Sequence, residues 1–400
     1  MKYDITIIGG GIVGLATAYQ LSQNRLDLKI ALVEKEEKVA QHQTGHNSGV
    51  IHSGIYYQPG GSKAINCQKG YRYLLDFCEQ EDISYDLIGK VIVATKPSEL
   101  AELDKIYERG VQNGLKGIRK ISKEETLEKE PRVNAVAAIW VPEAGIVDYA
   151  EVARKYLSIA QKRGLYLYAG QSLCEVVQKP NEITVVTNKK ELQTKMLITC
   201  AGLYSDKVAR MTGQNIDYQI LPFRGEYYDL LPEKEHLVNH LIYPVPDPNF
   251  PFLGVHFTPR IGGGVEAGPN AVLAFRREGY SRWNYNAAEL KETIGYKGFQ
   301  KIARQYWRTG LGEQIRSYSK TAFVRKLQQL LPSIKTSDLK RGGAGVRAMA
   351  CDVQGNLIDD FLILEQKNII NVCNAPSPAA TASLAIGEMV MMKVLKQMGQ

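Results

Sequence analysis

The first part of the chain alternates short apolar runs with an amphipathic segment of helix length. Residues 3–8 form an apolar run typical of a buried strand, residues 15–22 continue at helical spacing, and residues 29–33 form a second apolar run. A strand, a helix and a second strand in immediate succession predict a βαβ unit with parallel strands.

The same pattern continues to about residue 215 and returns near the end of the chain. Helical spacing predicts helices at 63–81, 99–113 and 148–163, and apolar runs predict strands at 87–95, 165–169, 173–177, 183–187 and 195–200. From residue 342 the signals of the first part return, with strands expected at 361–364 and 369–373 and a helix at 378–396.

A different pattern separates these parts. From residue 219 hydrophobic and polar positions alternate, which predicts antiparallel strands at 220–230, 241–245, 252–258 and 264–268, followed by a helical stretch at 287–331. We therefore expect an α/β protein with a discontinuous Rossmann-type nucleotide-binding domain at 1–85, 145–215 and 335–400. A mainly antiparallel α+β substrate domain, at 86–144 and 216–334, is inserted in it.

Three glycines at the junction of the first strand and helix carry the most specific chemical signal. Gly9, Gly11 and Gly14 form the G-x-G-x-x-G fingerprint, and Glu34 ends the second strand twenty residues later. The first glycine makes a tight turn, the second lets a pyrophosphate approach the backbone, and the third lets the helix pack on the strand. The helix N-terminus attracts phosphate. Glu34 can accept hydrogen bonds from ribose hydroxyls, which favours a dinucleotide without a 2′-phosphate.

Composition narrows the class of protein. The 400 residues are 44% hydrophobic and 23% charged, typical of a globular protein too long for one simple core. No apolar run reaches the 18 or so residues of a membrane span, and the N-terminus predicts a strand rather than a signal peptide. The six cysteines form no C-x-x-C pair, which favours reduced thiols in the cytoplasm. We therefore expect no metal site.

Basic residues are concentrated in one segment. Between Arg276 and Arg341 there are fifteen Lys and Arg against five Asp and Glu, a net charge of +10 in a chain whose total is +8. Such a segment suits a solvated helical face, an anionic membrane surface, nucleic acid or an acidic substrate. Residues 301–326 mix apolar side chains with seven Lys and Arg, which favours peripheral contact with anionic headgroups. The segment contains no nucleic-acid-binding module, so no nucleic-acid partner is expected.

Three further segments combine small residues with reactive side chains. Residues 44–57 place His46 and His52 among glycines and small residues just after the second predicted strand. Residues 343–347 are a glycine-rich approach to Arg347, and residues 374–381 open the last predicted helix. The N–H groups at the start of that helix can face a partial negative charge.

Longer blocks at 46–57, 222–225, 251–260, 268–275 and 375–378 carry a resemblance over nearly the whole chain. Through them the chain resembles the FAD-dependent oxidoreductases of the D-amino-acid oxidase and glycerol-3-phosphate dehydrogenase superfamily. Within it, the chain is most similar to the L-2-hydroxyglutarate oxidases and dehydrogenases. The resemblance implies a Rossmann-type FAD-binding domain, FAD as cofactor, and oxidation of L-2-hydroxyglutarate to 2-oxoglutarate by hydride transfer from C2 to flavin N5.

The resemblance also implies which residues hold the cofactor. The adenine half lies over the glycine fingerprint and Glu34, and the flavin half reaches the C-terminal glycine-rich segment and the start of the last helix. The implied cofactor-binding set is Gly9, Gly11, Gly14, Glu34, Lys35, Thr44, His46, Asn47, Ser48, Val177, Ala201, Gly202, Gly345, Ser377, Ala380 and Thr381. In some amine-oxidising relatives a histidine matching His46 bonds covalently to the flavin, and the sequence leaves this role open.

The implied substrate is a dianion with one secondary alcohol, so the reaction needs a base for the hydroxyl proton and cations for two carboxylates. His52 and Arg347 lie where relatives carry an active-site histidine and a substrate-binding arginine. An imidazole has an ordinary pKa near 6.5, which suits a base, and a guanidinium fork fits a carboxylate. Further candidates for contact with the substrate are His256, Arg260, Tyr56 and Arg276.

Two other functions remain open from the sequence. One is an amine oxidase of the same fold, of the glycine or sarcosine type, and the other is a flavoprotein that acts on RNA through the basic segment. The electron acceptor is open between quinone and oxygen. Oxygen fits a cytoplasmic oxidase, whereas quinone requires peripheral contact with the inner face of the cell membrane.

Overall fold

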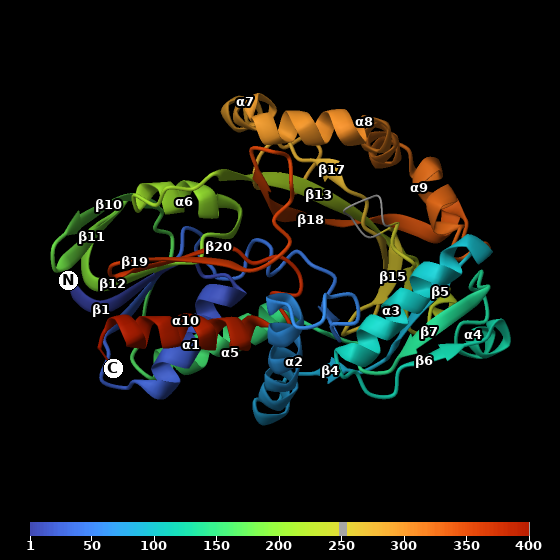
Figure 1. Ribbon diagram of the computed structural model, residues 1–400, viewed down its shortest axis with the longest axis horizontal. Helices are drawn as coiled ribbons and strands as arrows, with labels where there is room; N and C mark the ends of the chain where they lie inside the picture. Colours follow the sequence, from blue (N-terminus) through green and yellow to red (C-terminus); the bar gives the residue numbers. More distant parts are fainter. Residues whose placement is uncertain (248–253, 400) are drawn as a thin grey trace.

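The computed structural model describes residues 1–247 and 254–399, which form two halves built on separate sheets (Figure 1). The first sheet contains the N-terminal strand and the last strands of the chain, and its central strands are parallel. Its strands are β1 (Lys2–Ile8), β2 (Ile30–Val33), β9 (Tyr166–Tyr168), β10 (Leu173–Lys179), β11 (Glu182–Thr187), β12 (Glu191–Thr199), β19 (Leu362–Gln366) and β20 (Ile369–Asn374). The predicted βαβ unit is confirmed, and the strands expected at 173–177 and 183–187 are β10 and β11, which pair antiparallel.

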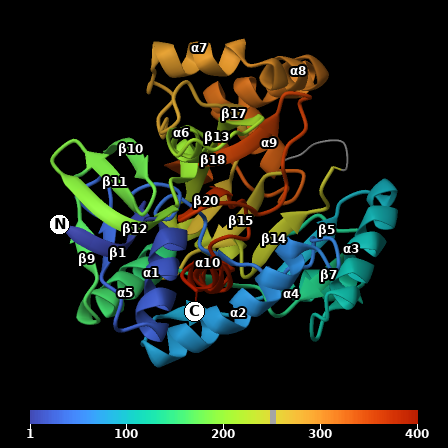
Figure 2. The same ribbon diagram turned by 60° about the vertical axis from the view of Figure 1, so that its left-hand side comes forward.

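Helices from distant parts of the sequence pack against one another beside this sheet. They are α1 (Ile12–Asn24), α2 (Ser62–Gln80), α5 (Tyr149–Lys162) and α10 (Ser383–Gln397). The turned view shows α1 beside α10, with both chain termini on the side of this sheet (Figure 2). α1 and α10 can approach closely because Gly387 has no side chain. A Cβ there would lie 2.7 Å from the carbonyl carbon of Ala16.

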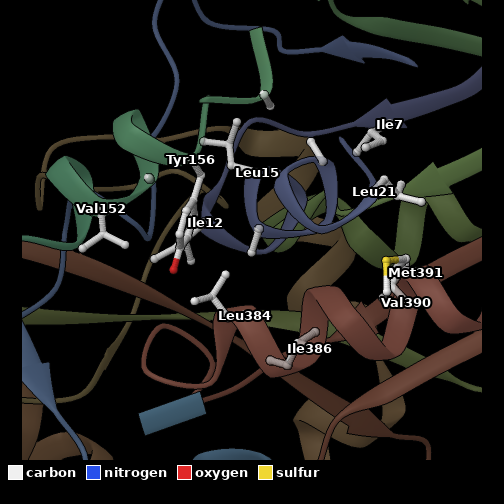
Figure 3. Packing of buried hydrophobic residues seen from close by; sticks show 14 of the residues in the cluster. Ile7, Ile12, Leu15, Leu21, Val152, Tyr156, Leu384, Ile386, Val390 and Met391 are labelled. Carbon is white, nitrogen blue, oxygen red and sulfur yellow. The ribbon is translucent and has the colours of Figure 1, made fainter. Parts of the chain in front are cut away.

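The core of this half lies where these helices meet. Ile12 and Leu15 of α1, Tyr156 of α5 and Leu384 of α10 are buried and belong to one apolar cluster (Figure 3). Burial of such side chains contributes about 1.5–3 kcal/mol each. The helices thereby fix the position of the glycine turn that precedes α1.

The second sheet is mainly antiparallel and carries the other half. Its strands are β5 (Lys90–Ala94), β6 (Arg119–Ile121), β7 (Ala137–Val141), β13 (Tyr218–Leu230), β14 (Leu241–Pro244), β15 (His256–Pro259), β16 (Val265–Gly268), β17 (Val272–Leu273) and β18 (Leu339–Asp352). β5 and β14 are parallel to each other, whereas the other pairs in this sheet are antiparallel. A small third sheet joins β3 (Val50–Ile51), β8 (Gly145–Val147) and β4 (Tyr85–Asp86).

The remaining helices do not belong to the group formed by α1, α2, α5 and α10. They are α3 (Leu100–Gln112), α4 (Lys123–Lys129), α6 (Ser205–Met211), α7 (Ala287–Gly295), α8 (Lys297–Tyr318) and α9 (Lys320–Leu327). Short 3-10 turns occur at Pro97–Glu99, Gly202–Tyr204, Pro232–Leu237 and Thr336–Asp338. α7, α8 and α9 run along one outer edge of the molecule (Figure 1).

Two expectations from the sequence need correction, and a third is only partly described. The helical stretch at 287–331 is divided into α7, α8 and α9, and α8 is kinked at Tyr306. The last helix begins at Ser383 rather than at Pro378, because the N–H groups of Ala379 and Ala382 close turns on the carbonyls of Pro376 and Pro378. The strand expected at 252–258 falls partly on residues outside the described ranges, and β15 begins at His256.

The strand β18 also departs from the expected domain division. It pairs with β13 from Leu339 to Asp352, so this stretch belongs to the second sheet, although the sequence placed 335–400 with the nucleotide domain. Strand pairing depends on a partner more than a hundred residues away, which the local pattern does not contain. The remaining domain boundaries stay a prediction.

None of the helices in the described ranges combines the length and apolarity that crossing a bilayer requires. All six cysteines are free thiols, and four of them are buried.

Candidate active site

A cavity of about 1280 Å³ is lined by residues of both halves. At one end lie the glycine turn, Glu34 and Thr44, which we call the nucleotide end. Several of the remaining lining residues have aromatic or basic side chains, and we call the part that they line the substrate end: His52, Tyr56, Tyr227, Tyr243, His256 and Arg347. Segments that are far apart in the sequence therefore line the same cavity.

The three fingerprint glycines have different structural roles. Gly9 has φ +105°, and a Cβ there would lie 2.3 Å from the carbonyl oxygen of Cys200. A Cβ on Gly14 would lie 2.1 Å from the carbonyl oxygen of Gly9, so this glycine permits α1 to pack against the turn. A Cβ on Gly11 would meet only the Thr44 hydroxyl, at 3.6 Å. Gly11 thus leaves cavity space that a pyrophosphate can use.

Glu34 fits the role expected for the ribose. Its side chain is 7% exposed, and its carboxylate accepts hydrogen bonds from the N–H groups of Gly10 at 2.6 Å and Glu36 at 2.9 Å. These bonds fix the carboxylate at the cavity wall, and each oxygen retains a lone pair for a hydroxyl. The glycine turn, the start of α1 and this anchored acid together fit an adenine dinucleotide such as FAD.

Most of the predicted cofactor residues line the cavity, but two do not. The lining includes Gly9, Gly11, Gly14, Glu34, Lys35, Thr44, His46, Asn47, Ser48, Ala201, Gly202, Gly345, Ser377 and Ala380. Val177 lies outside the cavity, on β10, and is 37% exposed. Leu173 at the beginning of that strand lines the cavity instead, together with Gln171 and Ser172.

Thr381 also lies outside the cavity wall, where it supports a predicted catalytic residue. Its buried hydroxyl accepts a hydrogen bond from the backbone N–H of His52 at 3.1 Å and lies 2.6 Å from the Tyr149 hydroxyl. The thiol of Cys67 donates to the carbonyl of His52 at 3.3 Å. The backbone of His52 is therefore held from both sides.

His46 lies on the cavity wall and is partly enclosed by neighbouring side chains. Its ring stacks on Tyr280 with centroids 4.1 Å apart, and its Nδ1 lies 3.0 Å from the carbonyl oxygen of Ala344. Burial lowers its pKa. Gly345 permits this arrangement, since a Cβ there would lie 2.4 Å from the carbonyl oxygen of His46. Covalent attachment of a flavin to His46 stays a prediction without a test.

His52 has an environment that keeps its imidazole neutral. Its Nε2 lies 3.3 Å from the Ser377 hydroxyl, on the turns that precede α10. Burial, and after it the electrostatic effect of Lys90, His256 and Lys63, lowers the pKa of His52 to about 3. The ordinary pKa assumed from the sequence is therefore corrected, because that assumption took no account of burial or of neighbouring cations.

The second sheet supplies the opposite wall of the substrate end. His256 stacks on Tyr243 with centroids 4.0 Å apart, and its Nδ1 lies 3.1 Å from the carbonyl oxygen of Gly254. Burial, and then the charges of Arg347 and Lys90, lower the pKa of His256 to about 3. Arg347, on β18, donates to the carbonyl of Asn270 at 3.5 Å. Tyr56 lines the same region, and its buried hydroxyl has no hydrogen-bond partner among the described residues.

Arg260 and Arg276 do not join this group. Arg260 forms ion pairs with Glu266 at 3.1 Å and Asp229 at 3.4 Å and does not line the cavity. Arg276 is also outside the cavity lining. Both lie in the predicted substrate domain, but outside its strands, where the sequence does not show which side chains meet the cavity.

Sequence reasoning missed a buried lysine next to the substrate end. Lys90, on β5, is 1% exposed, and its ammonium lies 4.3 Å from the centre of the Tyr243 ring. Tyr227 and Tyr243 were also missed, although they line the cavity. The available signal was a lysine inside an apolar run that predicts a buried strand, where a charge is unusual.

A cluster of Glu36, His42 and Glu278 lies at the nucleotide end. One ligand atom from each of the three residues lies within 4.8 Å of the other two, the spacing that a metal ion needs. The ammonium of Lys35 also contacts Glu278, so a cation there would have to displace it. The expectation of no metal site stays a prediction.

Comparisons with known proteins agree on one class of enzyme. The family described as FAD dependent oxidoreductase matches residues 4–391. The chain is 55% identical over 398 residues to a protein of Indibacter alkaliphilus named L-2-hydroxyglutarate dehydrogenase, covering 99% of this chain and 100% of the other. It is 44% identical over 406 residues to the human protein named L-2-hydroxyglutarate dehydrogenase, mitochondrial, covering 97% of this chain and 88% of the other.

Solved structures share the fold at low sequence identity. L-alpha-glycerophosphate oxidase from Mycoplasma pneumoniae, solved with FAD bound, matches with a TM-score of 0.81 at 24% identity and covers 100% of this chain and 95% of its own. Glycine oxidase from Geobacillus kaustophilus matches with a TM-score of 0.75 at 16% identity and covers 99% and 95%. At these identities the matches establish the architecture alone.

Proposed function

The chain belongs to the FAD-dependent oxidoreductase family, and on that premise we propose that it is a dehydrogenase that oxidises L-2-hydroxyglutarate to 2-oxoglutarate. Full-length relatives that carry this name support the substrate. The observation in the structure that supports it most directly is the composition of the substrate end, where a neutral histidine and an arginine line the same part of one cavity. Oxidation of a hydroxy acid requires both groups, a base for the hydroxyl proton and a cation for the carboxylate.

FAD, when bound, would supply the two-electron acceptor that oxidation at C2 of the substrate requires. The glycine turn and Glu34 would hold the adenine end of the cofactor, and the turns at 376–380 line the cavity together with His52. The start of α10 does not reach the cavity, so the turns at 376–380, rather than the helix N-terminus, would face the flavin.

His52 is the base in this proposal. Its pKa of about 3 leaves the imidazole neutral at physiological pH, so Nε2 is available to accept the proton of the C2 hydroxyl. Its backbone N–H donates to Thr381 and its carbonyl accepts from Cys67, which holds the backbone, and Ser377 lies beside the reacting nitrogen. A dianionic substrate next to this imidazole raises its proton affinity, because opposite charges favour the protonated form.

Arg347 holds a substrate carboxylate. Its guanidinium is planar and offers parallel N–H donors that match two carboxylate oxygens. The carbonyl of Asn270 orients it from the second sheet. His256 lies close enough for Arg347 to lower its pKa, so the neutral ring of His256 can bond to the same anion without competing for the charge.

Anaerobic reduction of the flavin tests the function. We expect L-2-hydroxyglutarate to bleach the flavin absorbance of the holoenzyme, with 2-oxoglutarate as the product. D-2-hydroxyglutarate, sarcosine and glycine should leave the spectrum unchanged over the same time. Reduction by sarcosine or glycine and not by L-2-hydroxyglutarate would establish the amine oxidase instead.

We also propose that α8 contacts an anionic membrane surface from the cytoplasmic side when a quinone is the electron acceptor. Trp307, Leu311, Ile315 and Tyr318 recur at helical spacing and are each 54–58% exposed. Lys301, Arg304 and Arg308 are exposed on the same helix. Within residues 301–326, Ile302, Phe323 and Val324 are buried in the core, and Tyr306 is partly buried against it. The exposed residues thus form a separate apolar stripe beside basic groups.

Co-sedimentation with liposomes tests this contact. Binding should occur with anionic vesicles at low salt, weaken as salt rises, and be slight with neutral vesicles. A double substitution, Trp307→Ser with Leu311→Ser, should reduce binding without changing flavin reduction. No binding at low ionic strength would favour oxygen as the acceptor.

A further inference from the structure

Lys90 is a buried cation that the assigned chemistry does not use. Its side chain starts from the second sheet, between β14 and β7, and is 1% exposed. Within residues 1–247 and 254–399 its ammonium has no ion pair and no hydrogen bond. An ammonium without such partners is costly to bury, so its presence requires a reason.

Its surroundings place this charge directly behind the substrate end. The ammonium lies 4.3 Å from the centre of the Tyr243 ring and 5.6 Å from that of Tyr56, two residues that line the cavity. Tyr243 in turn stacks on His256. Lys90 is also close enough to lower the pKa of His52 and of His256. The electron-rich ring faces hold the cation in place but do not neutralise it.

The lysines that line the cavity differ from Lys90, which lies behind its wall. Lys63 pairs with Asp359 at 2.7 Å, Lys207 pairs with Glu292 at 2.8 Å, and Lys35 pairs with Glu278. Their charges are therefore compensated by acidic side chains before any ligand arrives. Lys90 leaves a net positive charge in a region of low dielectric, where electrostatic attraction acts over a longer distance than in water.

We propose that Lys90 is a specificity-determining residue: its uncompensated charge behind Tyr56 and Tyr243 is balanced by the second carboxylate of the substrate, so that dicarboxylates bind in preference to monocarboxylates. The inference rests on the proposed function for the choice of a dicarboxylate. It assigns Lys90 a positioning role, because the ammonium acts through the ring wall and does not line the cavity. Its pKa, lowered to about 8 by burial, leaves it charged at pH 7.

Binding of two unreactive acids tests this role. The holoenzyme, its Lys90→Met and Lys90→Gln variants, and a Lys129→Met control are titrated at pH 7 with glutarate and with butyrate, followed by flavin absorbance. Lys129 is a fitting control because its ammonium also lies over an aromatic ring, that of Trp140 at 3.9 Å, and it does not line the cavity. Neither acid can be oxidised at C2, so the measurement does not depend on turnover.

We expect the Kd for glutarate to rise about 10- to 100-fold in both Lys90 variants. The Kd for butyrate should change by less than about threefold, and Lys129→Met should change neither value. The melting temperature of ligand-free Lys90→Met should rise by about 2–4 °C, because a buried uncompensated charge has been removed. A purely structural lysine would instead give a lower melting temperature.

Two results would overturn the inference. One is an unchanged Kd for glutarate in both Lys90 variants, and the other is an equal loss of affinity for glutarate and butyrate. Failure of the proposed function looks different: L-2-hydroxyglutarate would not reduce the wild-type flavin, while glutarate would still bind more tightly than butyrate in a Lys90-dependent way.

Discussion

The two ends of the cavity are built in different ways. At the nucleotide end, one continuous segment of about thirty residues supplies the strand, the glycine turn, the helix and the acid. At the substrate end, His52 follows β3, Tyr243 lies on β14, His256 lies on β15 and Arg347 lies on β18. The first end depends on backbone shape, whereas the second depends on charges that the fold brings together.

This difference predicts how each end fails when it is changed. Backbone shape tolerates no added atoms where a ligand must approach, so damage at the nucleotide end should remove the cofactor altogether. Charges and proton affinities are graded quantities, so changes at the substrate end should lower rates and affinities while the cofactor remains bound. Four predictions test this contrast.

Gly11→Val should have the largest effect, with loss of FAD from a folded protein. The new side chain would occupy the cavity where the pyrophosphate approaches, while its Cβ meets only Thr44 at 3.6 Å. The measurement is the flavin-to-protein ratio together with the circular dichroism spectrum. Gly295→Val is the control, because a Cβ at that remote position meets nothing within 4 Å. Full flavin content in Gly11→Val would refute the cofactor assignment.

His52→Ala should slow flavin reduction by roughly 10²–10⁴-fold, the usual contribution of a positioned base, with nearly normal flavin content. Stopped-flow measurement of anaerobic reduction gives the rate constant. His236→Ala serves as the matched histidine control, since His236 lies outside the cavity lining. Normal reduction kinetics in His52→Ala would exclude His52 as the base.

Arg347→Lys should weaken substrate binding by about 10- to 100-fold, since a charge-assisted hydrogen bond is worth roughly 1.5–3 kcal/mol and lysine lacks the fork. The substrate concentration that half-saturates flavin reduction measures this loss. Arg260→Lys is the matched control and should have little effect, because Arg260 pairs with Glu266 and Asp229 away from the cavity. Equal effects of the two substitutions would contradict the separation of these arginines.

The smallest effect is expected in the pH dependence of kcat/KM, which should not change on the acid side. His52 takes up a proton only near pH 3, so kcat/KM should stay flat from about pH 7 down to pH 5 rather than fall near 6.5. As the pH rises through about 8, Lys90 loses its proton and its charge, so KM for the dicarboxylate should rise. An acid limb near pH 6.5 in kcat/KM would show that His52 has its ordinary proton affinity in the free enzyme.

The sequence by itself determined the nucleotide end almost completely. The spacing of Gly9, Gly11, Gly14 and Glu34 was enough to predict their roles, because a turn, a helix start and an adjacent strand are local structures. The mixed βαβ and antiparallel pattern likewise predicted two kinds of sheet, and both are present. His52, His256 and Arg347 were found through resemblance, and the structure places all three on the cavity wall.

Only the tertiary structure decided how the charges are arranged. In the tertiary structure Arg260 forms ion pairs away from the cavity, β18 pairs within the second sheet, and Lys90 lies behind Tyr243. A proton affinity depends on burial and on charges contributed by distant segments, so the pKa of His52 could not be read from the residues around it in the chain. Spacing along a chain fixes local backbone shape, whereas electrostatics sums over neighbours in space.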